Sequence, residues 1–218
     1  MVELTRAWCD CLPTNVIVAK ADLEAGHYPL SQTDALSLQR VSARRRLEFA
    51  AGRACARAIC SMLGRYDANL GISASGAPVW PRGLVGTITH SRKMALAAGA
   101  SARDYENIGI DTEIVGHIED GILDLLFSKR EIEFVESLPY PEQEKVKTAL
   151  FCSKEAFFKA KTAMQKSFNS PNEIEIDVDI STKTFRSRVG DCTDDIGLYY
   201  FHGLHCVAFY LCKTQIHI

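Results

Sequence analysis

The stretch NIGIDTEIV, residues 107–115, predicts a β-strand, because apolar side chains alternate along it with polar or small ones. Successive side chains of a strand point to opposite faces, so its three isoleucines and Thr112 share one face. The carboxylates of Asp111 and Glu113 then project together from the other face. Like charges placed this close repel each other unless protons or a cation hold them. A magnesium ion, which prefers oxygen ligands, suits such a pair, although a solvated strand face also explains these two residues taken alone.

A long helix is predicted downstream, over Glu142–Gln165, because apolar residues recur there at helical spacing. On a helical wheel Glu155 lies at the edge of the apolar face, between Phe158 and Lys159. This position makes Glu155 a third candidate ligand for a cation. An i,i+4 ion pair between Glu155 and Lys159, worth about 0.2–0.5 kcal/mol, is the alternative. Lys154 and Lys159 flank this carboxylate and could neutralise a polyphosphate ligand.

A second long helix is predicted over Ser42–Leu63, with small and apolar residues on one face. Arg46, Arg53 and Arg57 form a stripe beside that face, because their offsets of seven and four residues place them on one flank. Such a stripe could neutralise a polyphosphate, and a solvated face is the alternative for each arginine.

Short strands and turns are predicted over the rest of the chain. SASGAPVWP, residues 73–81, is rich in turn residues, and strands are predicted over Val85–Ser91 and Met94–Ala100. His90, at the end of the first of these strands, could donate to a phosphate, with a structural hydrogen bond as the alternative. Further along, we predict a helix over Phe127–Ser137 and antiparallel strands over Glu173–Ile180, Thr184–Val189 and Leu198–Leu211. Helices first and strands after, in each half, indicate an α+β fold.

The composition is that of a globular chain that folds throughout. Its 218 residues, 47% hydrophobic and 24% charged, suit one domain or two small lobes. No apolar run reaches the roughly 20 residues of a membrane helix, and no signal peptide is recognisable at the start, so a cytoplasmic location is expected. The formal net charge of -2 gives no overall footprint for nucleic acid. The eight cysteines are scattered, and we expect them to be reduced and structural.

Five motifs follow one another along the chain: AAGR at residues 50–53, GAPVWP at 76–81, GTITHS at 86–91, GIDTE at 109–113 and FCSKEAFFKA at 151–160. With them the chain resembles, over most of its length, the 4′-phosphopantetheinyl transferases of the surfactin and enterobactin synthetase type. The resemblance implies two similar α+β lobes, 1–106 and 107–218, related by pseudo-twofold symmetry, with coenzyme A bound in the cleft between them. It also implies a reaction in which the phosphopantetheine arm of coenzyme A passes to a serine of an apo carrier protein and adenosine 3′,5′-bisphosphate leaves.

The resemblance also assigns roles to single residues. Asp111, Glu113 and Glu155 would bind Mg²⁺, with the pyrophosphate of coenzyme A completing the shell. Catalytic roles would fall to Glu131, Glu155 and Lys159, with Glu131 of FSKRE as the general base or a metal-bound water in its place. Contacts with coenzyme A would come from Arg46, Arg53, Gly76, Ala77, Pro78, Thr89, His90, Ser91, Asp111, Lys154 and Lys159. Among these, the arginine of AAGR would hold the 3′-phosphate and the turn of GAPVWP the adenine.

Two other functions fit parts of the same pattern. A Mg-dependent phosphodiesterase or nuclease also needs clustered carboxylates, although such sites commonly add further ligands, and histidines are few here. A non-catalytic coenzyme A binding module would use the arginine stripe and GAPVWP but has no need of three carboxylates. For the transferase, the expected partners are peptidyl, aryl or acyl carrier domains of nonribosomal peptide, siderophore or polyketide synthesis. The chain is expected to act as a monomer.

Overall fold

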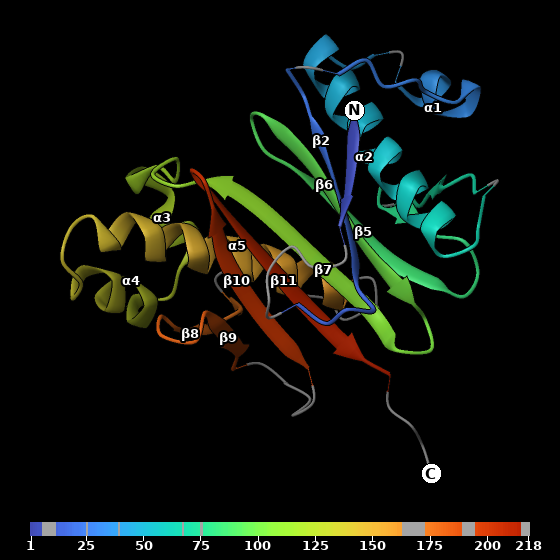
Figure 1. Ribbon diagram of the computed structural model, residues 1–218. Coiled ribbons are helices and arrows are strands. Elements are labelled where there is room, and N and C mark those ends of the chain that lie inside the picture. The colour runs from blue at the N-terminus through green and yellow to red at the C-terminus, as the bar shows by residue number, and fades with distance from the viewer. Residues whose placement is uncertain are drawn as a thin grey trace. The chain divides into compact units, whose positions relative to one another are not determined.

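The computed structural model describes residues 1–5, 12–24, 26–38, 40–66, 68–74, 76–162, 173–188 and 195–214. The chain divides into two compact units, Met1–Ala102 and Arg103–Ile218. In each unit one long helix packs against an antiparallel sheet (Figure 1). This arrangement confirms the α+β class predicted from the sequence. Among the helices described, none is long and apolar enough to cross a membrane.

The first unit has a four-stranded antiparallel sheet in the order β1-β2-β6-β5. Its strands are β1 (Val2–Thr5), β2 (Ile17–Asp22), β5 (Leu84–His90) and β6 (Met94–Ser101). A short helix and a small strand pair accompany the sheet: α1 (Gln32–Ser37), β3 (Gly71–Ile72) and β4 (Pro78–Val79). The long helix α2 (Ala43–Met62) packs against β2 and β6, and it begins at Ser42, whose hydroxyl accepts from the backbone N–H of Arg45 at 3.1 Å.

The second unit has a five-stranded antiparallel sheet in the order β7-β11-β10-β9-β8. Its strands are β7 (Tyr105–Ile114), β8 (Ile176–Asp179), β9 (Thr184–Ser187), β10 (Ile196–His202) and β11 (His205–Lys213). Its helices are η1 (Asp120–Ile122), α3 (Leu123–Leu126), α4 (Lys129–Glu136) and α5 (Glu142–Thr162). Helix α5 lies across β7 and β11, and Phe157 packs edge-on against Tyr210 with ring centroids 4.8 Å apart. Helix α5 therefore covers the edge strand β7 and its neighbour β11.

Most predicted elements are confirmed within a few residues, and α2, α4, α5, β5, β6 and β7 match them. The predicted end of the last long helix, beyond residue 162, falls outside the described residues. The predicted order of helices before strands in each half is wrong, because each unit begins with a strand. No helix or strand was predicted before Ser42, whereas the structure has β1 and β2 there. The predicted strand Leu198–Leu211 is wrong as a single strand. It is the hairpin β10–β11, which turns at Gly203, a residue whose φ of 60° is open to glycine at no steric cost.

Candidate functional site

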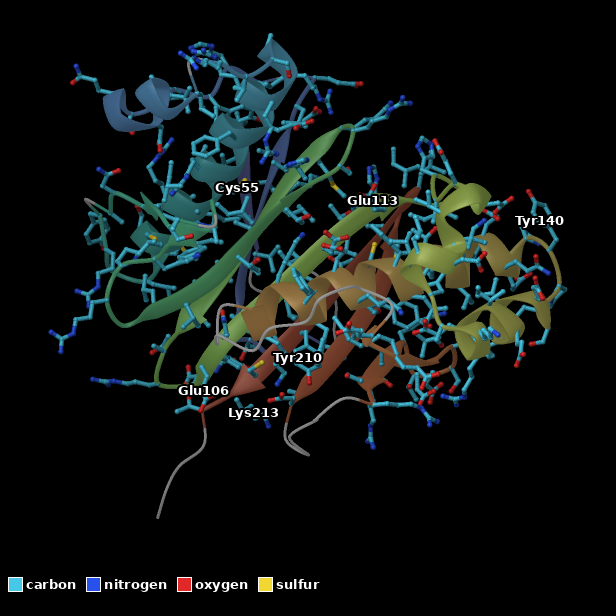
Figure 2. All side chains as sticks on the ribbon, turned by 180° about the vertical axis from the view of Figure 1, so that it is seen from behind. Cys55, Glu106, Glu113, Tyr140, Tyr210 and Lys213 are labelled. Carbon is cyan, nitrogen blue, oxygen red and sulfur yellow. The ribbon has the colours of Figure 1, made fainter. Side chains whose placement is uncertain are left out.

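One face of β7 carries the predicted acidic residues toward helix α5. On this face the amide of Asn107 donates to a main-chain carbonyl of α5 at 2.9 Å. Further along the strand, Lys159 Nζ of α5 donates to Asp111 Oδ1 at 2.6 Å. Glu113 shares the face, because side chains alternate along a strand, and Figure 2 labels it at the opposite end of β7 from Glu106. The two carboxylates project together, as the alternating pattern predicts.

Helix α5 approaches β7 most closely at Gly109. A Cβ atom on this glycine would lie 1.7 Å from the carbonyl oxygen of Ala156 and 3.1 Å from the backbone nitrogen of Ala160. Only a residue without a side chain leaves room for the helix here. Because Glu155 and Lys159 directly precede these two alanines, the contact sets how far their charged groups lie from the strand.

Gly109→Ala is expected to push α5 away from β7, because the new methyl group would overlap a backbone carbonyl. Overpacking of this kind costs about 1–3 kcal/mol, so the unfolding temperature should fall by roughly 2–12 °C. Any activity of this site should fall further than the loss of folded protein explains, because Glu155 and Lys159 move with the helix. Thermal unfolding and an activity assay on the folded variant test this. Gly121→Ala, at a glycine with open space around it, is the matched control, and equal behaviour of the two variants would contradict the prediction.

The pKa values of Glu113 on β7 and Glu155 on α5 are both raised. Burial, and then the negative charge of Asp111, raise the pKa of Glu113 to about 7. Burial and Asp111 also raise the pKa of Glu155. The ammonium of Lys159 opposes both shifts. Burial lowers the pKa of Lys159, but the charge and hydrogen bond of Asp111, together with the charge of Glu155, outweigh burial and raise it. The three acids therefore lie close enough to interact, and they carry more negative charge than the lysine neutralises.

The three carboxylates form a donor set that fits Mg²⁺. Their oxygens are hard donors. A divalent cation would offset the burial and the repulsion from Asp111 that raise the pKa values of Glu113 and Glu155. In the described part of the chain, however, no group of three or more His, Cys, Asp or Glu side chains is arranged closely enough to hold a metal ion. The ammonium of Lys159 also lies 2.6 Å from Asp111 Oδ1. Metal binding at these residues therefore requires their side chains to move.

Glu113→Gln is expected to stabilise the metal-free protein at pH 8. The folded-state pKa of about 7 lies above the ordinary value of 4.5, so the folded state binds the proton more tightly and loses stability as the pH rises between these values. Glutamine removes this loss, which in a partly exposed site we expect to be about 1 kcal/mol, or about 2–4 °C in unfolding temperature. Thermal unfolding in a chelator at pH 8 and pH 5 measures the effect. A gain of the same size at both pH values would contradict this explanation.

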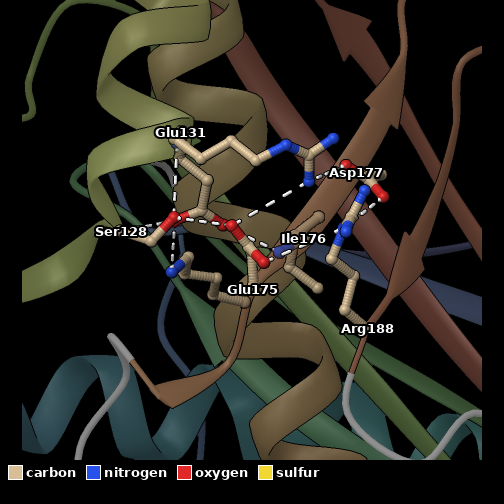
Figure 3. Close-up of polar contacts among 8 residues, drawn as sticks. Ser128, Glu131, Glu175, Ile176, Asp177 and Arg188 are labelled. Atoms are coloured by element: carbon tan, nitrogen blue, oxygen red, sulfur yellow. Dashed lines mark hydrogen bonds and ion pairs between the residues drawn. The ribbon is translucent and has the colours of Figure 1, made fainter.

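Glu131 lies in a separate buried network that joins α4 to α5 and β8 (Figure 3). Its Oε2 accepts from the backbone N–H of Ser128 at 2.7 Å and from Lys154 Nζ at 2.6 Å, and its Oε1 accepts from the backbone N–H of Ile176 at 2.7 Å. The side chains of Glu131 and Lys154 are 3% and 2% exposed. Both residues hold the fold together here. Their predicted roles, Glu131 as general base and Lys154 as a coenzyme A contact, stay predictions and would require this network to open.

The arginines of the predicted stripe on α2 donate hydrogen bonds to main-chain carbonyls of their own unit. Arg46 donates to Leu38 at 2.9 Å, and Arg57 donates to Pro29 at 3.0 Å. Arg53 is buried and donates to two carbonyls at the start of β3, both at 2.9 Å. These bonds fasten neighbouring segments to α2. The contacts of Arg46 and Arg53 with coenzyme A therefore stay predictions.

A cationic cluster that the sequence patterns did not reveal lies where α2 begins and β5 ends. Arg44 and Arg45 approach Glu48 at 2.7 and 3.7 Å. Arg45 also contacts Nε2 of His90, whose Nδ1 lies 3.7 Å from Glu48. Arg44 donates to the carbonyl of Ser91 at 3.4 Å, and the buried hydroxyl of Ser91 has no hydrogen-bond partner in the part of the chain that is described. In the sequence, the run of three arginines at residues 44–46 could have indicated this cluster.

The turn predicted to meet the adenine, Gly76–Pro78, leads into β4, whose first residue is Pro78, and its first two residues are exposed. Trp80, just beyond it, packs against two glycines that face each other across β5 and β6. A Cβ atom on Gly86 would lie 2.5 Å from the indole ring, and one on Gly99 would lie 3.2 Å from it. This packing anchors the turn to the sheet and links the motifs GAPVWP and GTITHS. Thr89, further along β5, is buried.

Models of known protein families match both units of the chain. Residues 33–100 match the model of the 4′-phosphopantetheinyl transferase N-terminal domain, and residues 107–208 match that of the 4′-phosphopantetheinyl transferase superfamily. The chain is 38% identical over 126 residues to the 4′-phosphopantetheinyl transferase Npt of Nocardia iowensis, covering 54% of this chain and 52% of Npt. It is 34% identical over 188 residues to the 4′-phosphopantetheinyl transferase Svp of Streptomyces mobaraensis, covering 82% of this chain and 74% of Svp. The match to PptT of Mycobacterium tuberculosis has 32% identity and covers 62% of this chain and 59% of PptT.

Solved structures similar to parts of the chain include two bacterial holo-(acyl-carrier-protein) synthases. The Bacillus anthracis protein, in complex with CoA (3′,5′-ADP), has 19% identity and a TM-score of 0.40, over 51% of this chain and 99% of its own. The Thermotoga maritima protein has 17% identity and a TM-score of 0.41, over 50% of this chain and 63% of its own. The matches to Npt and PptT thus span between half and two thirds of those relatives, whereas that to Svp spans most of both chains. On the two family models and the match to Svp, the chain belongs to the 4′-phosphopantetheinyl transferase superfamily.

Proposed function

We propose that this chain transfers the 4′-phosphopantetheine group of coenzyme A to a serine of an apo carrier protein and releases adenosine 3′,5′-bisphosphate. Family membership supports this reaction. The observation that carries it is the convergence of Asp111, Glu113 and Glu155 around Lys159 on facing elements of the second unit. A surplus of negative charge beside one partly exposed ammonium suits a site for a metal and a diphosphate.

Asp111, Glu113 and Glu155 are the residues that would hold Mg²⁺. Bound there, the ion would offset the charge that develops on the leaving adenosine 3′,5′-bisphosphate. Lys159 would bind a phosphate oxygen of the diphosphate from the same side, since its ammonium already lies among these carboxylates. Positioning of the diphosphate, rather than covalent chemistry by the protein, would then be the main contribution of these residues.

The cationic cluster of the first unit suits another phosphate of coenzyme A. His90 lies beside Arg44 and Arg45, and the buried hydroxyl of Ser91 lacks a hydrogen bond among the residues described. A phosphate would give this hydroxyl an acceptor and the guanidinium groups a bidentate partner. We therefore assign the 3′-phosphate contact to these residues in addition to Arg53, which donates hydrogen bonds to the carbonyls of Leu70 and Gly71.

The family resemblance also gives the serine proton to Glu131. Both oxygens of this carboxylate accept hydrogen bonds, one of them from a buried ammonium. Proton transfer would therefore have to reach a buried carboxylate that already accepts three hydrogen bonds. The finer assignments are proposals as well: the surfactin and enterobactin synthetase type, a carrier of nonribosomal peptide or siderophore synthesis, a monomer and a cytoplasmic location.

The test is to incubate the protein with coenzyme A, Mg²⁺ and several apo carrier domains, and to weigh each carrier by mass spectrometry. One added phosphopantetheine on a carrier, absent when its serine is replaced by alanine, is the expected result. Coenzyme A binding with every carrier unmodified would favour a non-catalytic binding module. Cleavage of nucleic acid or of a phosphodiester under the same conditions would favour the phosphodiesterase or nuclease.

A further inference from the structure

We infer that Lys159 couples metal binding to diphosphate binding, by holding Asp111 until a diphosphate draws its ammonium away. This inference rests on the proposed metal site of Asp111, Glu113 and Glu155. It adds a property of the free protein, namely that the divalent ion binds weakly when coenzyme A is absent.

The ion pair between Lys159 and Asp111 takes an oxygen that the metal would need. Lys159 Nζ lies 2.6 Å from Asp111 Oδ1 and 3.3 Å from the carbonyl oxygen of Ile110. A magnesium ion binds a carboxylate oxygen at about 2.0–2.1 Å, and an ammonium on the same oxygen would repel it at short range. The ammonium and the ion therefore compete for one carboxylate.

Lys159 can leave Asp111 without unpacking the helix. Its side chain is 29% exposed, whereas that of Asp111 is 6% exposed and fixed on β7. The lysine stem is long and flexible. Glu155, one turn earlier on α5, interacts with the same ammonium. Movement of one side chain is thus enough to free the oxygen of Asp111.

A diphosphate supplies what makes this movement favourable. Its oxygens give the ammonium a new anionic partner and also give the ion further ligands. The diphosphate and the ion should then each strengthen the binding of the other by the same factor, because coupling between two binding sites is reciprocal. Couplings of this kind are typically about 5- to 150-fold.

Lys159→Met removes the competing ammonium and keeps most of the stem. In this variant the metal should bind the free protein several-fold more tightly than in the wild type. Coenzyme A should then strengthen metal binding less than in the wild type, because only the direct ligation of the ion by the diphosphate remains. Lys159→Arg keeps the charge and should keep part of the coupling. Lys145→Met, at an exposed lysine of the same helix about 21 Å along its axis, is the control for loss of one positive charge.

The experiment titrates Mn²⁺ into each protein and follows free Mn²⁺ by electron paramagnetic resonance, without and with saturating coenzyme A and no carrier. The Mn²⁺ taken up by coenzyme A alone is measured separately and subtracted. In the wild type and in Lys145→Met, coenzyme A should tighten Mn²⁺ binding by about tenfold. In Lys159→Met this factor should be at least about threefold smaller than in the wild type, because Mn²⁺ no longer competes with the ammonium in the free protein.

Two results would overturn the inference. One is equal Mn²⁺ affinity of the wild type and Lys159→Met in the absence of coenzyme A, and the other is full coupling in Lys159→Met. If transfer proceeds but coupling is absent, the inference fails while the proposed function stands. If the wild type binds no Mn²⁺ even with coenzyme A bound, the metal site fails, and the inference fails with it. Circular dichroism of each variant confirms that it is folded.

Discussion

Asp111→Asn is expected to lower the rate of phosphopantetheine transfer by at least about 100-fold while the protein stays folded. Asparagine keeps the shape of the side chain but removes the charge that would bind the metal and that now pairs with Lys159 at 2.6 Å. After burial, the charge of Asp111 is the largest cause of the raised pKa values of Glu113 and Glu155. Removing its charge therefore weakens the metal site at its most buried member.

The stability of Asp111→Asn should change little. Loss of the ion pair with Lys159 is offset by relief of the repulsion with Glu113 and Glu155. The measurements are carrier modification by mass spectrometry and thermal unfolding in a chelator. Glu106→Gln, which neutralises an exposed carboxylate on the same strand, is the control and should be as active as the wild type. Activity of Asp111→Asn near that of the control would remove Asp111 from the metal site.

Glu131→Gln is expected to lower the free energy of unfolding by about 3–5 kcal/mol, the usual effect of breaking a buried ion pair. The variant leaves the ammonium of Lys154 buried and without its charged partner, at a position only 2% exposed. It also weakens the bonds that Glu131 accepts from the backbone of Ser128 and Ile176. The unfolding temperature should fall by roughly 6–20 °C.

A second variant separates this structural role from the role of a general base. Glu131→Gln combined with Lys154→Met removes both charges, so it should recover much of the lost stability. Thermal unfolding of both variants is the measurement, with transfer rates determined below the transition. An unchanged unfolding temperature together with lost transfer would contradict the structural assignment and favour Glu131 as the proton acceptor.

Local patterns predicted the parts of the fold that depend on nearest neighbours in the chain. The two-residue alternation over 107–115 placed Asp111 and Glu113 on one face, and helical spacing placed Glu155 and Lys159 at the edge of α5. Both expectations need only the regular geometry of a strand and a helix. The approach of the two elements at Gly109 depends on tertiary packing, and the spacing gave no sign of it.

Other features depended on residues far apart in the chain and were not predicted. Arg53 and Lys154 looked like solvated or ligand-binding cations, but each is buried against partners in other segments. The hairpin β10–β11 was not recognised, because Gly203 is the only strong turn residue in an otherwise strand-forming run. Arg44 and Arg45 were overlooked because the helical stripe was chosen by its spacing. The contacts of Arg44 with Ser91 and of Arg45 with His90 depend instead on where β5 ends.

The most direct test of the metal site is anomalous diffraction from crystals of the protein grown with Mn²⁺ and coenzyme A. We predict one anomalous peak within bonding distance, about 2.0–2.3 Å, of oxygens from Asp111, Glu113 and Glu155, with Lys159 moved from Asp111 to a phosphate. A peak bound only by phosphate and water, with Lys159 still on Asp111, would contradict the central claim that these three carboxylates bind the ion.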